Sequence, residues 1–215
     1  MKGLLLKDWY QVRTSMKTMY LSVAFVLVIW MFSTSSAYVF PVSYAAVFLG
    51  ILPVNLLAYD HASGWTEYSF ALPLSKELQV AEKYLVGLLC TAVSAALNGI
   101  FCGILFWMGK PLPAMPIGLL LGAGAASILL INGIMLPLYY RFGAEKARML
   151  YMLMFAGMGA ALGGGAVMDE LQQNGTGSGP LPVPLWLAAV LLLVVLTLYA
   201  VSWRVSVAWY GKYKK

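Results

Sequence analysis

The sequence predicts an all-α membrane protein, and two observations lead to that prediction. The chain of 215 residues is 61% hydrophobic and only 10% charged, whereas a soluble domain carries about a quarter charged residues. The charges are also gathered together, so that long stretches contain no Asp, Glu, Lys or Arg. A helix that crosses the hydrocarbon core needs roughly 20 mostly apolar residues, and the uncharged stretches have room for six such helices.

The uncharged stretches also set the boundaries of the predicted spans. The first stretch, Thr18 to Tyr59, is long enough for two helices joined by the polar sequence STSS at residues 33–36. Each of the other four stretches gives one helix. The predicted spans are approximately residues 17–33, 38–58, 84–107, 116–139, 149–167 and 185–205. They form one transmembrane domain that covers residues 1–215.

The segment before the first span, MKGLLLKDWYQVRTSMK, is predicted to be a helix in the cytoplasmic interface of the membrane. It combines basic residues with an apolar stripe at helical spacing, which is typical of helices that lie on a membrane surface. The stripe consists of Leu5, Trp9, Val12 and Met16. The alternative is that the segment only sets the topology of the first span.

The Lys and Arg residues predict which way the helices face. In a six-span topology, 13 of the 14 Lys and Arg residues fall on one side and only Lys110 falls on the other. Since basic loops stay in the cytoplasm, we expect a multi-pass membrane protein with both termini cytoplasmic. The net charge of +6 is then explained by contact with anionic lipid, and no nucleic-acid partner is expected.

The connection between the second and third spans, residues 59–83, is a dense group of charged, aromatic and proline residues. Within it, SGWTEYSFAL is predicted to form a short amphipathic helix, capped by Ser63 or Gly64 and ended by Pro73. Ser75 then caps the helix that continues into the third span. The composition leaves two interpretations open, a helix that docks a partner or a solvated loop that holds two spans in register.

Several kinds of chemistry are missing from the sequence. It contains no GxxxxGK[ST] motif for nucleotide phosphates, and one histidine with two cysteines inside a span does not make a usual zinc site. The uncharged stretches also disfavour an ion-coupled carrier, which keeps ionisable groups at membrane depth. Asn55, Asn98 and Asn132 are candidates to line a polar path or to hydrogen-bond between helices. We therefore expect no enzyme activity, cofactor or metal, and an energy source outside this chain.

Three stretches resemble the ABC-2 type permeases. The order Gly64-Trp65-Thr66-Glu67, then FALPLSK, then Glu82-Lys83-Tyr84, is similar to the segment between their second and third membrane helices. MKGLLLKDWY and RFGAEKARMLYML are similar to the opening and to the fourth-to-fifth loop of small Gram-positive permeases, especially those of the phenol-soluble modulin exporter type. The chain departs from the family pattern at Trp65, where Thr is common, and at His61, where the small permeases often carry an acid.

The resemblance implies one half of an ATP-driven exporter of amphipathic or antimicrobial peptides, located in the bacterial cell membrane. Two such permeases, identical or different, would pair with two separately encoded ATPase subunits that bind ATP and Mg. The coupling helix on the ATPase would comprise Ser63, Gly64, Trp65, Glu67, Tyr68, Phe70, Leu72, Pro73 and Ser75. A second cytoplasmic contact would comprise Arg141, Glu145, Lys146 and Arg148. The alternative is a non-transporting membrane sensor or assembly partner that recruits an ATPase.

Overall fold

The computed structural model of the protein describes residues 2–15, 17–32, 39–72, 75–110, 117–172 and 185–210, and these residues are helical almost throughout. In chain order the helices are α1 (Lys2–Ser15), α2 (Lys17–Phe32), α3 (Val39–Ala62), α4 (Trp65–Ala71), α5 (Lys76–Trp107), α6 (Ile117–Gln172) and α7 (Leu185–Tyr210). The described residues contain no strand. The predicted all-α class is confirmed.

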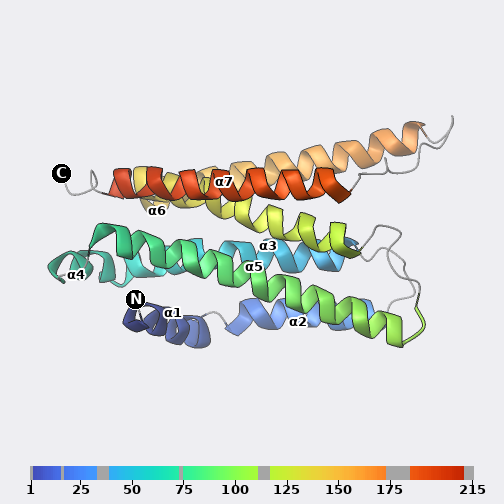
Figure 1. Ribbon diagram of the computed structural model, residues 1–215, viewed down its shortest axis with the longest axis horizontal. Helices are drawn as coiled ribbons and strands as arrows, with labels where there is room; N and C mark the ends of the chain where they lie inside the picture. The colour runs from blue at the N-terminus through green and yellow to red at the C-terminus, as the bar shows by residue number, and fades with distance from the viewer. Residues whose placement is uncertain are drawn as a thin grey trace.

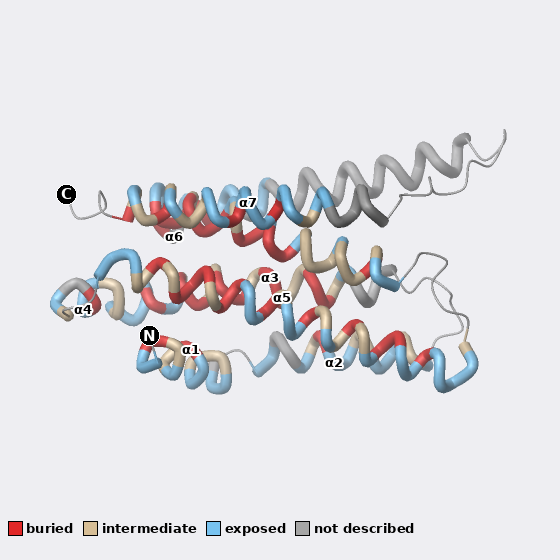
Figure 2. The backbone as a smooth tube through the Cα atoms, in the orientation of Figure 1, coloured by how far each residue is buried: buried red, intermediate tan, exposed pale blue. Residues whose placement is uncertain are grey.

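The long helices lie side by side along one axis, with α1 and α2 on one side of the α3–α5 layer and α6 and α7 on the other (Figure 1). α6 packs against α3, α5 and α7, which places it at the centre of the bundle. The buried residues concentrate where α3, α5 and the first part of α6 meet (Figure 2). Leu56, Val80, Ile128 and Leu136 are fully buried there. Close packing of these apolar side chains holds the bundle together.

α6 consists of two helical parts separated at Gly143, whose φ of 79° and ψ of 176° are not helical. The chain turns back at this point, so that the second part of α6 runs in the opposite direction to the first (Figure 1). The predicted loop between the fourth and fifth spans, residues 141–148, is shorter than expected, because the residues on either side of Gly143 are helical. Glycine lacks a Cβ atom and tolerates this conformation, so one residue is enough for the reversal.

Four helices of the described part are long and apolar enough to cross a membrane. They are Ser43–Ala62, Lys76–Trp107, Ile117–Gly143 and Val190–Tyr210, which coincide with the predicted second, third, fourth and sixth spans. Leu21–Phe32, within the predicted first span, is a shorter apolar helix. The predicted fifth span is helical, but most of its side chains lie outside the described part. The count of six spans therefore stays a prediction.

α5 is longer than the predicted third span. Its 32 residues give a length of about 48 Å at roughly 1.5 Å per residue, which exceeds the hydrocarbon thickness of about 30 Å. Ser75 begins the helix, and its side chain accepts a hydrogen bond from the Leu78 backbone N–H at 3.3 Å, as the sequence predicted. The first turns of α5, residues 76–83, therefore project beyond the apolar region and carry polar groups.

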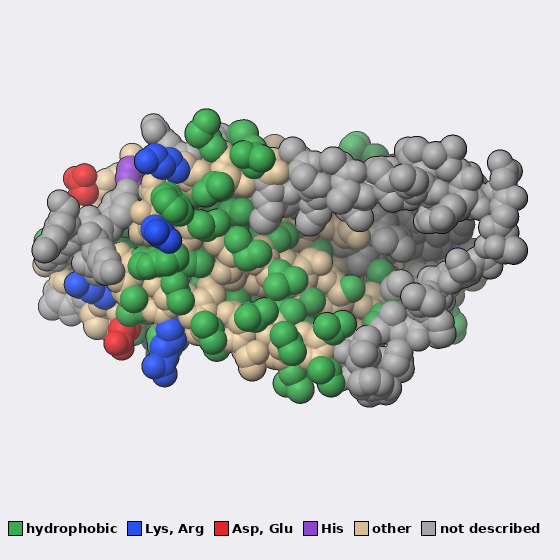
Figure 3. All heavy atoms as spheres, turned by 90° about the horizontal axis from the view of Figure 1, so that it is seen from above, with side chains coloured by type: hydrophobic (Ala, Val, Ile, Leu, Met, Phe, Trp, Pro, Cys, Tyr) green, Lys and Arg blue, Asp and Glu red, His purple; other side chains and the backbone are tan. Residues whose placement is uncertain are grey.

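The described outer surface of the bundle is mostly apolar away from the end where α4 lies. α7 exposes a row of aliphatic side chains, including Leu191, Val194 and Leu198. On the face seen in Figure 3, the charged side chains gather at the end where α4 lies, and hydrophobic side chains cover the described part beyond it. A membrane protein carries such a surface because lipid tails are as apolar as the side chains that face them.

Candidate functional site

α4 is a short helix at the end of the bundle where both chain termini lie (Figure 1). The chain leaves α3 and enters α4 through Gly64, which has a left-handed φ of 72° and stands at the N-cap without a side-chain hydrogen bond. Of the two predicted caps, Ser63 and Gly64, the glycine occupies the position. A residue without a Cβ atom adopts this φ at little cost, so the chain makes a tight turn between the helices.

The predicted coupling residues of α4 face different ways. Tyr68 is 58% exposed, and Glu67 is exposed beside it. Trp65 is half-buried, and the Lys7 ammonium lies 4.7 Å from the centre of its ring. Trp65 therefore holds α4 on the protein through a cation–π contact. The Tyr68 ring packs on the Trp65 ring at a centroid distance of 5.5 Å and leaves more than half of its own surface exposed, next to the exposed Glu67.

Three of the remaining predicted coupling residues, Ser63, Leu72 and Ser75, lie on the flanks of α4. Ser63 and Ser75 are exposed, and Leu72 is half-buried after the last turn. The side chain of Phe70 and all of Pro73 lie outside the described residues. At one end of the bundle, α4 therefore combines an exposed acid, Glu67, and an exposed aromatic ring, Tyr68, with a side that is attached to the protein through Trp65.

Below α4, five charged side chains from α1, α3 and α5 form a compact charge cluster. The Lys83 Nζ atom lies 2.8 Å from an oxygen of Asp8 and 2.8 Å from an oxygen of Asp60. The Lys7 Nζ atom lies 2.7 Å from Asp60 and 3.2 Å from Asp8. Glu82 is the fifth member, with its Oε1 atom 3.9 Å from the Lys83 ammonium.

The charge cluster is buried and ties three helices together. Asp8, Asp60, Glu82 and Lys83 are each at most 4% exposed. The Glu82 Oε1 atom finds no hydrogen-bond partner among the described residues. Charges removed from water must be paired closely, because each ion loses its hydration when it is buried. The cluster therefore fixes the position of α1 against the ends of α3 and α5.

Sequence reasoning missed this cluster. Lys7 and Lys83 count there among the residues that set the topology, and Lys83 belongs to the Glu82-Lys83-Tyr84 motif, but neither lysine is paired with an acid there. The partners are far apart along the chain, since 75 positions separate Asp8 from Lys83. The signal in the sequence was that the motif Glu82-Lys83 and the acid Asp60 stand at opposite ends of the connection between the predicted second and third spans.

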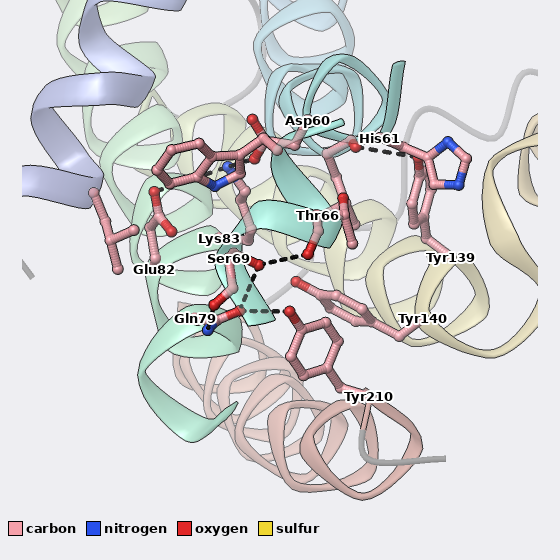
Figure 4. A pocket seen from close by; sticks show the side chains of 13 residues that line it. Asp60, His61, Thr66, Ser69, Gln79, Glu82, Lys83, Tyr139, Tyr140 and Tyr210 are labelled. Carbon is pink, nitrogen blue, oxygen red and sulfur yellow. Dashed lines mark hydrogen bonds and ion pairs between the residues drawn. The ribbon is translucent and has the colours of Figure 1, made fainter. Parts of the chain in front are cut away.

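A small cavity separates α4 from the bundle (Figure 4). Its volume is about 50 Å³, and a water molecule occupies about 30 Å³ in the liquid. Pockets for small-molecule ligands measure about 300–1,000 Å³, so this cavity has room for water and not for a nucleotide or a peptide. Its lining includes Asp60, Glu82, Lys83, Tyr139, Tyr140 and Tyr210.

A family model described as "ABC-2 family transporter protein" matches residues 3–211 of the chain. The chain belongs to the ABC-2 family of transporter proteins. It is therefore a multi-pass membrane protein of the permease type, a membrane subunit that is not itself catalytic. The match includes α4 and all members of the charge cluster. Searches among curated proteins and solved structures found no match to the chain.

The predicted second cytoplasmic contact of this ABC-2 protein lies at the reversal in α6. The Arg141 guanidinium stacks 4.8 Å from the ring centre of Trp209 on α7 and 5.1 Å from that of Phe142. Lys146 is exposed, and the side chains of Glu145 and Arg148 lie outside the described part. Arg141 therefore has a partner within the protein, and the contact with a second chain stays a prediction.

The predicted apolar stripe of the N-terminal segment divides between two environments. Leu5 and Val12 pack on a buried cluster of α3 and α5 side chains. Trp9 is 63% exposed, and Met16 lies outside the described residues. In this ABC-2 protein, α1 is thus attached to the bundle by apolar contacts and by the charge cluster. Its location in the membrane interface stays a prediction.

Proposed function

We propose that this ABC-2 protein is the membrane-spanning half of an ATP-driven exporter and that α4 is the helix through which a separate ATPase drives it. The observation that carries this proposal is the orientation of α4. Its outer side exposes Glu67 and Tyr68, and its inner side is held by Trp65 next to the charge cluster. A coupling element needs both features, because it must reach the partner and must also be attached to the helices that it moves.

The proposed complex contains two permeases, identical or different, and two ATPase subunits that bind ATP and Mg. The cargo is proposed to be an amphipathic or antimicrobial peptide. The cavity below α4, at about 50 Å³, is too small for a peptide, so we place the path between the two permeases. The exposed apolar faces of α5 and α7 support this location, since a path for an amphipathic cargo needs apolar walls.

The docking role of α4 is tested by Glu67→Ala and Tyr68→Ala. We expect each substitution to weaken binding of the cognate ATPase by about tenfold or more, because aromatic and charged anchors of interfaces cost about 2 kcal/mol when truncated. The stability of the permease should not change, since neither side chain is buried. The measurement is a dissociation constant in nanodiscs, with Glu77→Ala as the matched control because Glu77 is an exposed acid on α5. Wild-type affinity of both α4 variants would contradict the proposal.

The proposal also requires α4 to be cytoplasmic. We expect a cysteine at Met108, at the far end of α5, to react with a membrane-impermeant maleimide in intact cells. A cysteine at Ser63 should react only after permeabilisation, because residues beside α4 lie on the positively charged side. Cys90 and Cys102 are buried and are replaced by alanine in both variants. The reverse labelling pattern would place α4 outside the cell and away from any ATPase.

The alternative function, a sensor or assembly partner, is distinguished by movement of cargo. An exporter reconstituted with its ATPase should move a labelled amphipathic peptide across liposomes only when ATP is present. Binding of the ATPase without ATP-dependent movement of such peptides would favour the alternative. An ATPase gene and a second permease gene next to this one would favour the exporter.

A further inference from the structure

One side chain, Gln79 in the first turns of α5, contacts two other helices (Figure 4). Its Nε2 atom donates a hydrogen bond to the Ser69 backbone carbonyl in α4 at 3.2 Å. Its Oε1 atom lies 3.2 Å from the Ser69 hydroxyl and also accepts a hydrogen bond from the Tyr210 hydroxyl at the end of α7. Gln79 therefore links α4, α5 and α7 at a single point.

The link to α4 depends on the amide group of Gln79. The Ser69 hydroxyl has one proton, and it lies 2.8 Å from the Thr66 carbonyl as well as 3.2 Å from Gln79. The Ser69 carbonyl also accepts a hydrogen bond from the Leu72 backbone N–H at 3.3 Å within the last turn of α4, so the bond from Gln79 Nε2 is the one that joins this carbonyl to α5. Ser69 is only 3% exposed, so this link lies inside the protein, beside the cavity below α4.

The link to α7 ends at a buried residue. Tyr210 is 7% exposed, and its ring packs edge-on against Tyr140 at a centroid distance of 5.3 Å. Further along, α7 is tied to α5 by the Tyr199 hydroxyl, which donates to the Tyr84 carbonyl at 2.8 Å. The bond from Tyr210 to Gln79 thus joins the end of α7 to the same side chain that holds α4.

We propose that Gln79 is a positioning residue that transmits displacement of α4 to α7 through Tyr210. This inference rests on the proposed function of α4 as the docking helix. α7 is suited to respond, because many of its apolar side chains, including Leu191, Val194 and Leu198, are exposed and not packed inside the bundle. When the ATPase moves α4, the end of α7 moves with it.

The test measures movement of α7 and needs no cargo. A cysteine at Ala208, which is exposed near the end of α7, is introduced after Cys90 and Cys102 are replaced by alanine. In the complex with the cognate ATPase, we expect ATP to change the rate of maleimide modification at this cysteine. Gln79→Ala and Tyr210→Phe should each reduce that ATP-dependent change by about threefold to tenfold, the effect of one hydrogen bond. ATPase binding and the response of a cysteine at Ser63, beside α4, should persist.

Tyr199→Phe is the matched control. It also removes a tyrosine hydroxyl bond between α7 and α5, but it does not touch α4, so the response at Ala208 should persist. Three outcomes would overturn the inference: no ATP response in the wild-type complex, a full response in Tyr210→Phe, or an equal loss in Tyr199→Phe. Should Gln79→Ala fail to fold, Tyr210→Phe decides, because it keeps the ring packing. The proposed function fails separately if Glu67→Ala and Tyr68→Ala leave ATPase binding unchanged.

Discussion

Lys83→Met is expected to lower the free energy of unfolding by about 3–5 kcal/mol, the usual cost of removing one partner from a buried ion pair. The Lys83 ammonium contacts Asp8 and Asp60 at 2.8 Å and is 2% exposed. Without it, Lys7 alone faces three buried carboxylates, which cannot regain their hydration. The measurement is denaturation in detergent micelles, followed by tryptophan fluorescence.

Lys76→Met provides the matched control for Lys83→Met. Both lysines lie near the start of α5, but Lys76 is exposed, so its loss should change the free energy of unfolding by less than about 0.5 kcal/mol. The double variant Asp60→Asn/Lys83→Met should recover part of the stability, because it removes one of the unpaired charges. Equal stability of the two lysine variants would show that the charge cluster contributes nothing to the fold.

Gly143→Ala is expected to destabilise the protein by about 1–3 kcal/mol, because a side chain is strained in the backbone conformation at this turn. The φ of 79° and ψ of 176° at Gly143 belong to a region that only glycine adopts readily. The two parts of α6 meet at this residue, so the strain falls on the reversal between two predicted spans. Denaturation in micelles measures the loss.

Gly122→Ala is the control for Gly143→Ala, since it places the same methyl group on the same helix. A Cβ atom at Gly122 meets nothing within 4 Å, and alanine favours a helix over glycine by about 1 kcal/mol. This variant should therefore be as stable as the wild type or more stable. A Gly143→Ala protein that unfolds like Gly122→Ala would mean that the reversal does not depend on glycine.

Local signals in the sequence predicted the parts of the fold that depend on local physics. Four of the predicted spans coincide with helices of sufficient length and hydropathy, because hydropathy over about 20 residues is itself the quantity that places a helix in lipid. The cap at Ser75 was also predicted, since it needs only a hydroxyl at the right place. The length of the connection between the fourth and fifth spans was not predicted. A single glycine, Gly143, reverses the chain there, and composition does not show that one residue is enough.

The sequence predicted where the candidate site lies along the chain, but not which of its side chains contact the protein and which are exposed. The sequence placed a short amphipathic helix between the second and third spans, and α4 is that helix. Trp65 and Glu67 were treated alike as docking anchors, yet Trp65 lies beside Lys7 and Glu67 is exposed. In a helix of seven residues, the pattern alone does not decide which side faces the protein, because that depends on what lies beneath.

The sequence by itself thus determined the membrane class, four of the spans and the polar end of this protein, all of which follow from properties of neighbouring residues. Only the tertiary structure decided which polar groups meet. Asp8 and Lys83 are 75 positions apart, and Gln79 and Tyr210 are 131 positions apart. Such contacts arise when the packing of α1, α4, α5 and α7 brings distant side chains together. Buried polar groups then pair because burial without a partner is costly, and no periodicity along the chain encodes which partner each one finds.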